Sequence, residues 1–340
     1  MPIDTEVLAE RYRVATIDVA NRKLLVTNFR GTEQEKDLTE PANCDGFGRI
    51  RHFHRKTSPG WPLNPLPIDP ARAALRLGPQ DEIRAQVFQN AACNWRCWYC
   101  FVPFNLLSAD PAHSTWLSPS ELFQLFLKVD DRPLILDLSG GQPELVPEWT
   151  YWMIEEIERN GLQGQVYLWS DDNLSCDYFW RYLNPAQQEV VAKYPFYGRV
   201  ACFKGFDNES FAFNTRAEKS WFDRQFDLMQ RLVQSGMDVF AYATFTAPSS
   251  SRIADAMPRF VDRLQAIDEN LPLRTIPLEI QKFTPIITRL NGSLLTTFDH
   301  QWRAVEAWQR ELDRRFSASM RNLPITEIRI GRFPVRRHDA

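Results

Sequence analysis

The chain has 340 residues, with 40 Lys and Arg against 43 Asp and Glu, which gives a formal net charge of −3. Hydrophobic residues make up 44% and charged residues 24%, so the composition excludes a wholly disordered, collagen-like or coiled-coil chain. The near balance of charge gives no reason to expect a polyanion as an obligatory partner. The first residues, MPIDTEVLAERYRV, lack an apolar signal segment, and no later window approaches the ~20 apolar residues of a membrane span. We therefore expect a cytoplasmic protein without membrane contact.

Residues 1–81 predict a β-containing extension. Strands at 12–18 and 23–28 flank a polar turn at 20–22, and the Pro-rich passage WPLNPLPIDP follows. We expect this extension to be an appendage of the fold and not a second core.

Strands and helices alternate over residues 82–285, the expected core. A strand at 82–90 is followed by a helix that opens at Ser118 with a capping box to Glu121 and Pro119 at its first position. Further strands are expected at 134–138, 165–170, 198–203, 238–245 and 275–281, and further helices at 147–159, 184–193, 218–235 and 252–267. About six such units predict the α/β class and an incomplete (β/α)6 TIM-like barrel of parallel strands. Catalytic groups should lie at the carboxyl ends of the strands.

Residues 286–340 form the C-terminal part. An amphipathic helix is expected at about 299–316, followed by the basic tail RIGRFPVRRHDA.

Three of the six cysteines fall in one octet, Cys93-Asn-Trp-Arg-Cys97-Trp-Tyr-Cys100, on the loop after the first core strand. In a reducing compartment this pattern indicates metal binding or catalysis instead of disulfides. Thiolates are soft ligands that select iron–sulfur clusters, zinc or Cu(I). A [4Fe-4S] cluster held by three cysteines leaves one iron open to a non-protein ligand, as a reaction at that iron would require.

At these residues the sequence resembles the radical S-adenosylmethionine (radical SAM) superfamily, whose CxxxCxxC signature has an aromatic residue before the last Cys, here Tyr99. The resemblance covers about residues 85–285. It implies that the open iron chelates the amino and carboxylate groups of SAM, and that an electron from the reduced cluster cleaves SAM to methionine and a 5′-deoxyadenosyl radical, which removes a substrate hydrogen. Only Cys176 and Cys202 follow the motif, so we expect the single-cluster branch and an external flavodoxin- or ferredoxin-type electron donor.

Three further strand ends resemble segments of the family that contact SAM. Ser139-Gly140-Gly141-Gln142-Pro143 resembles a Gly-Gly-Glu-Pro segment, with Gln142 in place of Glu, and by resemblance borders the methionine part of SAM. Asp171 and Asn173 match an acidic-x-Asn motif that contacts the ribose. Phe203-Lys204-Gly205 is similar to a segment of glycyl-radical activases, in which Lys204 could reach the SAM carboxylate or the substrate.

The sequence leaves three readings of the function open. The first is hydrogen abstraction from a partner protein, suggested by the activase-like segments. The second is modification of a nucleotide, a nucleobase or a small metabolite, motivated by tail arginines that could contact phosphates, namely Arg329, Arg332, Arg336 and Arg337. The third is a non-catalytic iron–sulfur or zinc module. A zinc site could be completed by Cys44, His52 or His54.

Overall fold

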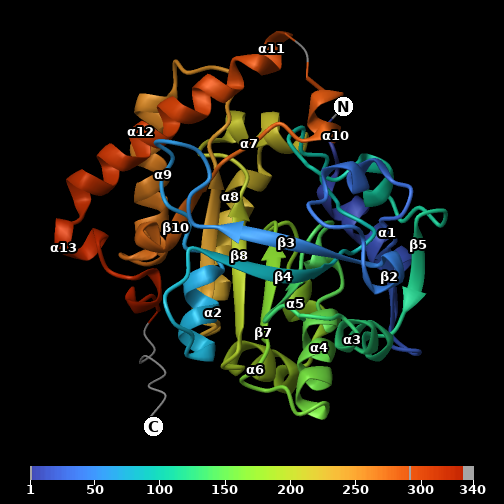
Figure 1. Cartoon of the computed structure of the whole chain (residues 1–340). Helices are drawn as coiled ribbons and strands as arrows, with labels where there is room; N and C mark the ends of the chain where they lie inside the picture. The colour runs from blue at the N-terminus through green and yellow to red at the C-terminus, as the bar shows by residue number, and fades with distance from the viewer. Residues whose placement is uncertain (1, 291, 332–340) are drawn as a thin grey trace.

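The computed structural model of the chain describes residues 2–290 and 292–331, so Arg332, Arg336 and Arg337 of the tail lie outside the described residues. Two sheets are found within these ranges (Figure 1): a seven-stranded sheet of order β10-β9-β8-β7-β6-β4-β3 and a three-stranded sheet of order β1-β2-β5. The strands are β1 (Ile17–Asp18), β2 (Lys23–Thr27), β3 (Gly48–His54), β4 (Glu82–Phe88), β5 (Ser114–Leu117), β6 (Ile135–Leu138), β7 (Tyr167–Asp172), β8 (Tyr197–Phe203), β9 (Val239–Thr244) and β10 (Thr275–Leu278).

The seven-stranded sheet is parallel from β4 through β10, and β3 joins it as an antiparallel edge strand. The register of β3 on β4 runs from Gly48 opposite Phe88 to His54 opposite Glu82. The sheet is strongly curled, so that β3 and β4 cross in front of the upright strands β7 and β8 in Figure 1. This mixed α/β sheet agrees with the expected α/β class and with a partial barrel.

The helices are α1 (Thr5–Thr16), α2 (Ile68–Leu75), α3 (Pro119–Leu127), α4 (Glu148–Arg159), α5 (Tyr178–Tyr182), α6 (Pro185–Lys193), α7 (Asn208–Thr215), α8 (Trp221–Gln234), α9 (Ile253–Ile267), α10 (Thr284–Ile287), α11 (Gly292–Leu295), α12 (Thr297–Arg315) and α13 (Ala318–Arg321). Helices α3, α4, α6, α8 and α9 lie between successive parallel strands in the chain, and α8 and α9 cover one face of the curled sheet. The capping box predicted at the start of α3 is formed, because the Ser118 side chain accepts from the Glu121 N–H.

The predicted strand at 12–18 is wrong over most of its length. Helix α1 begins after the N-cap Asp4, whose side chain accepts from the Val7 N–H, and ends at Thr16, so that only two residues remain for β1. Its buried residues are Thr5, Ala9, Tyr12, Arg13 and Thr16. This spacing follows the helical period of 3.6 and not the alternation of a strand.

The N-terminal extension is part of the core and not an appendage. Strand β3 belongs to the main sheet. In the Pro-rich passage, the Trp61 indole N–H donates to the Pro277 carbonyl at 3.3 Å, and the Asn64 side chain donates to the Tyr242 hydroxyl at 3.0 Å. The passage therefore connects β3 with β9 and β10, at the other side of the open sheet.

Alternation along the strands defines two faces of the main sheet. Phe203 packs on Phe226 of α8 and Phe260 of α9, with ring centroids 4.9 and 5.7 Å apart, so its face is the one covered by the connecting helices. We call the opposite face the inner face. Its lower part is apolar, with Trp169 and Phe240 in one cluster with residues of α2.

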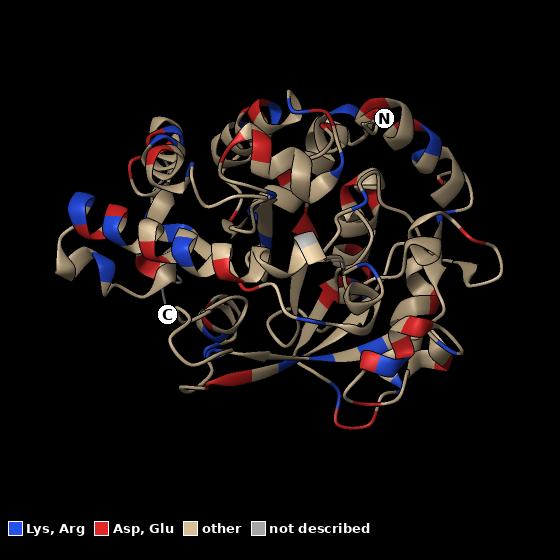
Figure 2. Cartoon of the chain, turned by 90° about the horizontal axis from the view of Figure 1, so that it is seen from above, with Lys and Arg blue, Asp and Glu red and all other residues tan. Residues whose placement is uncertain are grey.

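Acidic and basic segments are interspersed along the peripheral helices (Figure 2), as expected from the near balance of charge. Among the described residues, we find no helix whose length and apolar character would let it cross a membrane.

Candidate functional site

The candidate site residues follow four neighbouring parallel strands, β4, β6, β7 and β8. Since the carboxyl ends of parallel strands meet at one edge of a sheet, the structure brings these segments together. The Gln142 N–H donates to the Ala92 carbonyl at 2.7 Å, and the Asn173 amide lies 3.5 Å from the Cys93 sulfur. The Gln225 side chain of α8 donates to the carbonyls of both Asn173 and Cys202.

The cysteine loop, residues 93–100, is fixed by backbone hydrogen bonds. The Cys93 N–H donates to the Leu107 carbonyl at 3.1 Å, and the Trp98 N–H donates to the Asn214 carbonyl at 3.2 Å. Cys93 and Cys97 are buried and Cys100 is half-buried. The loop therefore holds all three thiols close to Lys204, beyond the carboxyl ends of the parallel strands.

Burial raises the pKa of each of the three thiols, and raises that of Cys97 to about 12. The Lys204 ammonium lowers the pKa of all three thiols. Neighbouring thiols of the motif raise the pKa of Cys93 and of Cys97. Among the described residues, no three His, Cys, Asp or Glu side chains form a ready ligand set for a metal ion. The structure thus brings the three thiols into one region, but their sulfur atoms are not arranged as the ligands of a metal ion.

Tyr99 packs between the cysteine loop and the end of β9. Its hydroxyl lies 3.1 Å from the Thr244 hydroxyl, and its ring meets the Trp98 ring edge-on at a centroid distance of 5.8 Å. The Trp98 indole N–H in turn donates to the Asn214 side chain at 3.0 Å. Tyr99 therefore connects the loop to the inner face.

The two glycines after β6 lie directly against residues 89–92, which lead from β4 into the cysteine loop. Gly140 and Gly141 have φ values of +85° and +64°. A Cβ atom on Gly141 would lie 2.2 Å from the Asn90 carbonyl oxygen and 2.6 Å from that of Ala92. A side chain is excluded there by space and by backbone conformation alike.

The side chain of Gln142 is fully buried and is used within the protein. Its carbonyl oxygen accepts from the Asn173 N–H at 3.0 Å, and its amide N–H donates to Asp172 at 3.1 Å. Gln142 is therefore a positioning residue that orients the end of β7. It does not turn its side chain toward the open edge, where the resemblance would have it contact a ligand.

Asp171 and Asp172 point to opposite faces at the end of β7. Asp171 is half-buried on the inner face and accepts from the Ser139 hydroxyl at 2.5 Å. Asp172 is buried on the other face and lies 3.6 Å from the Arg199 guanidinium, which also pairs with Glu144 at 2.8 Å. Burial raises the pKa of Asp172, and raises that of Glu144 to about 7. The sequence analysis missed this buried network, although Arg199 in an otherwise apolar strand is a signal for it.

Lys204 is buried at the end of β8. Burial lowers the pKa of its ammonium, but the charges of Tyr99 and of nearby thiols outweigh burial and raise it. Its backbone carbonyl accepts from the Asn214 side chain at 2.8 Å. Within the described part of the chain its ammonium has no hydrogen-bond or ion-pair partner, so it is free to meet an anionic group.

Arg289, which the sequence analysis missed, holds the cysteine loop from the C-terminal part of the chain. Its guanidinium donates to the Cys100 carbonyl at 2.6 Å and to the Val102 carbonyl at 2.9 Å, and lies 3.8 Å above the Phe104 ring. No local sequence signal identifies a contact between residues this far apart in the chain.

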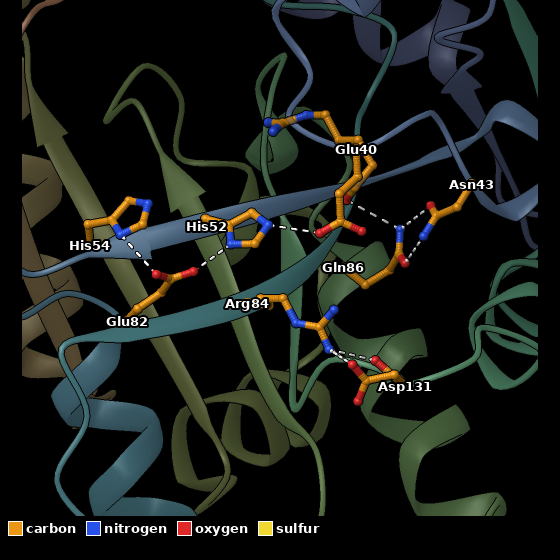
Figure 3. A network of polar contacts seen from close by, with 9 residues as sticks. Glu40, Asn43, His52, His54, Glu82, Arg84, Gln86 and Asp131 are labelled. Carbon is orange, nitrogen blue, oxygen red and sulfur yellow. Dashed lines mark hydrogen bonds and ion pairs between the residues drawn. The ribbon is translucent and has the colours of Figure 1, made fainter.

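The histidines of the zinc alternative are occupied elsewhere. His52 hydrogen-bonds Glu82 through Nδ1 at 2.6 Å and Glu40 through Nε2 at 2.8 Å, and His54 pairs with Glu82 at 3.2 Å (Figure 3). In the register of β3 these histidines alternate with Arg49 and Arg51 and therefore lie on the opposite face of the strand. Both ring nitrogens of His52 already have protein partners.

Comparisons with known proteins return only partial similarity. No family model and no curated protein match the chain. Three structures of Streptococcus suis SuiB are similar to part of it. SuiB bound to S-adenosylmethionine is 16% identical with a TM-score of 0.43, over 65% of this chain and 46% of that chain. SuiB bound to the precursor peptide SuiA is 16% identical with a TM-score of 0.37, over 52% and 36%. A further SuiB structure is 15% identical with a TM-score of 0.43, over 66% and 46%. The chain thus spans less than half the length of the SuiB chains that it matches.

Proposed function

We propose that the chain is a radical SAM enzyme in which Cys93, Cys97 and Cys100 hold one [4Fe-4S] cluster. One observation carries the proposal: the cysteine loop and the three segments that resemble SAM contacts follow adjacent parallel strands and are joined by hydrogen bonds at one edge of the sheet. Such an edge is where ligands bind in α/β barrels.

The donor set fits such a cluster. Three thiols share one loop, and the Trp95 N–H lies 3.5 Å from the Cys93 sulfur. Burial raises the pKa of Cys100, and a hydrogen bond from the Val102 N–H offsets part of that rise. Hydrogen bonds to sulfur tune iron–sulfur clusters, and the nearby Lys204 charge favours thiolates. When bound, the cluster supplies an electron of low potential and one iron that the protein leaves open to SAM.

This chain's own residues would bind and orient SAM. The main-chain carbonyls of Gly140 and Gly141 are suited to accept from the SAM ammonium, and the free ammonium of Lys204 is suited to its carboxylate. The half-buried carboxylate of Asp171 would accept from the ribose hydroxyls, with Asn173 beside it. Tyr99 would close the loop over this edge.

A partner protein or peptide is the substrate that we propose, following the activase-like segments, and an external flavodoxin- or ferredoxin-type protein would supply the electron. Bound SAM would supply the 5′-deoxyadenosyl group that takes up one hydrogen atom of the substrate, and 5′-deoxyadenosine would be the product.

The test is anaerobic reconstitution with iron and sulfide, followed by reduction with dithionite in the presence of SAM. The unaltered protein should hold about four irons per chain and form 5′-deoxyadenosine. Cys97→Ala should lose both properties, whereas Cys176→Ala, a matched change of a buried cysteine outside the motif, should keep them. A protein that holds the cluster but does not cleave SAM would refute the proposal. Retention of zinc in place of iron would favour a non-catalytic module.

A further inference from the structure

The inner face carries a polar layer below the cysteine loop, made of Arg49 and Arg51 from β3 and Asp137 from β6. Arg49 is opposite Val87, which is opposite Asp137, so Arg49 and Asp137 lie in one row of the sheet on either side of Val87. Residues opposite each other in a sheet point to the same face. Arg51 lies 3.6 Å from Asp137 and stacks on Phe53 at 4.1 Å.

Polar side-chain atoms of Arg49 and Asp137 in this layer lack hydrogen-bond partners among the described residues. Arg49 is 6% exposed, and its Nε and Nη2 atoms have no partner among the described residues. Asp137 is fully buried, and neither of its carboxylate oxygens accepts a hydrogen bond there. Burying charge without hydrogen bonds is costly, so such groups require an explanation.

The buried Arg13 shows how the same chain satisfies an arginine that has only a structural role. Its guanidinium donates to both oxygens of Glu148, at 3.0 and 2.5 Å, and to the Leu145 carbonyl at 3.1 Å. Arg49 has no such carboxylate. Its guanidinium instead lies over the rings of Phe101, at 5.3 Å, and Phe29, at 6.0 Å. Because Phe101 directly follows Cys100, the polar layer adjoins the cysteine loop.

The unpaired atoms of Arg49 and Asp137 match a particular kind of ligand. The Nε and Nη2 atoms form the edge of a guanidinium that binds a carboxylate through two parallel hydrogen bonds. The Asp137 oxygens accept from an N–H group. Arg51 is 29% exposed and Asp171, above the layer, is half-buried, so the buried atoms of Arg49 and Asp137 lie next to side chains that reach solvent on the inner face.

We propose that Arg49 and Asp137 anchor the substrate through a carboxylate and an N–H group on adjacent atoms, as in a free amino acid or the C-terminal residue of a peptide. This inference rests on the proposed function, because it names the substrate class of the same site. Arg49 holds the carboxylate, Asp137 accepts from the nitrogen, and the rest of the substrate extends toward the cysteine loop.

The experiment measures binding to the reconstituted protein by thermal unfolding, with probes titrated at constant ionic strength. N-acetylglycine represents the peptide terminus, glycine the free amino acid, and N-acetylglycinamide is the neutral control that keeps the N–H group. One of the two acids should bind at least tenfold more tightly than the amide, and which acid does so identifies the source. If neither acid is preferred to the amide, the inference is overturned.

Two substitutions separate the two contacts. Arg49→Gln should weaken the preferred acid about ten- to a hundredfold without affecting the amide, as expected for loss of hydrogen bonds to a charged group. Asp137→Ala should weaken acid and amide alike, because it removes the oxygens that accept from the nitrogen of either probe. If the Arg49 variant does not fold, the Asp137 variant still tests whether this layer binds the probes. Arg84→Gln is the matched control, since Arg84 lies on the other face of β4 and pairs with the exposed Asp131 (Figure 3). Equal binding of the acid by the Arg49 and Arg84 variants would contradict the proposal.

The binding assay requires no SAM cleavage, which keeps the two proposals distinguishable. A protein that forms 5′-deoxyadenosine but shows no preference for the acid overturns the anchor alone. A protein that prefers the acid in an Arg49-dependent way but never cleaves SAM overturns the proposed function and leaves the anchor standing.

Discussion

The buried side chain of Gln142 connects the ends of β6 and β7, and its replacement by Glu tests this geometry. Glu is the residue found in the Gly-Gly-Glu-Pro segment that the chain resembles, and an acidic group near an ammonium would be expected to tighten SAM binding. The structure predicts the opposite. In Gln142→Glu, one oxygen still accepts from the Asn173 N–H, but the other faces the carboxylate of Asp172.

The distance between these two groups gives the expected loss in free energy of unfolding. The Gln142 amide nitrogen and the Asp172 oxygen are 3.1 Å apart, and two negative charges at that separation repel by ~5 kcal/mol at an effective dielectric constant of about 20. Arg199 offsets only part of this repulsion, because its guanidinium is shared between Glu144, at 2.8 Å, and Asp172, at 3.6 Å. Uptake of a proton avoids it, at ~1.4 kcal/mol for each pH unit above the ordinary Glu pKa of about 4.3.

The smaller of these two costs applies at each pH, so the variant should be less stable by ~4 kcal/mol at about pH 7 and by ~1 kcal/mol at about pH 5. The sign follows from linkage: the pKa of the new carboxyl is raised by folding, and stability is therefore lost as the pH rises. Urea unfolding of both proteins at the two pH values measures the difference. Gln142→Met, which removes the hydrogen bonds without adding charge, should lose stability equally at both.

The reasoning would be refuted by a Glu variant that is as stable as the unaltered protein at about pH 7, or that loses the same free energy at both pH values. The same variant should bind SAM more weakly, because repulsion between the new carboxylate and Asp172 disturbs the end of β7, which carries Asp171 and Asn173. Tighter SAM binding would mean that the side chain faces the ligand.

The remaining predictions concern the cluster, SAM and the polar layer. Replacing any motif cysteine with Ala should abolish iron binding, whereas Cys44→Ala and Cys202→Ala should retain about four irons per chain, and iron analysis decides between one cluster and more. Asp171→Ala should weaken SAM binding about ten- to a hundredfold at unchanged iron content, by loss of a hydrogen bond to a charged group, and an unchanged affinity by calorimetry would reject the ribose contact. Arg289→Ala removes hydrogen bonds to the Cys100 and Val102 carbonyls, so cluster absorbance should bleach severalfold faster in air; an unchanged rate would show that the loop needs no such support. Burial and the nearby Asp171 raise the pKa of Asp137 from 3.8 to about 8, so its favourable contribution to stability is present below pH 3.8 and lost as the pH rises through 8. Asp137→Asn should gain on the unaltered protein by ~1.4 kcal/mol per pH unit in that interval, and parallel pH profiles of unfolding would contradict this.

Local patterns in the sequence sufficed for most of the parallel strands and for the long helices between them. From α3 onward the expected elements agree with the structure in type and nearly in bounds, because each has a clear apolar period and several helices begin with a capping box, as at Ser118 and Asn184. Cys202 and Lys204, two residues apart at the end of β8, lie on one face because side chains alternate along a strand. The grouping of the four site segments followed from strand order alone.

Features that depend on long-range contacts were not predictable in this way. Strand β3 has no apolar alternation of its own, because Arg49 and Arg51 occupy the inner face and His52 and His54 the outer one. The direction of the Gln142 side chain is set by Asp172 and Asn173, which belong to another strand. In both cases the residues concerned are polar, and a local pattern of apolar residues says nothing about where polar side chains point.

The N-terminal extension and the C-terminal segment, which lie outside the six parallel strands, also contribute to the candidate site. An open curled sheet leaves two edges, β3 and β10, and a strand edge exposes unpaired backbone groups. The Pro-rich passage bonds to Pro277 and Tyr242, and Thr284 of α10 donates through its N–H and hydroxyl to Asp37, so segments from both ends of the chain meet across this opening. Arg289 then reaches from the same C-terminal segment to the cysteine loop, and Arg49 reaches from the N-terminal extension to Phe101 beside it. The parallel strands thus supply the residues proposed to bind SAM, whereas the two terminal extensions fix the loop and supply the cation proposed to select the substrate. Variants in the extensions should therefore alter substrate binding and cluster lifetime while leaving SAM affinity largely unchanged.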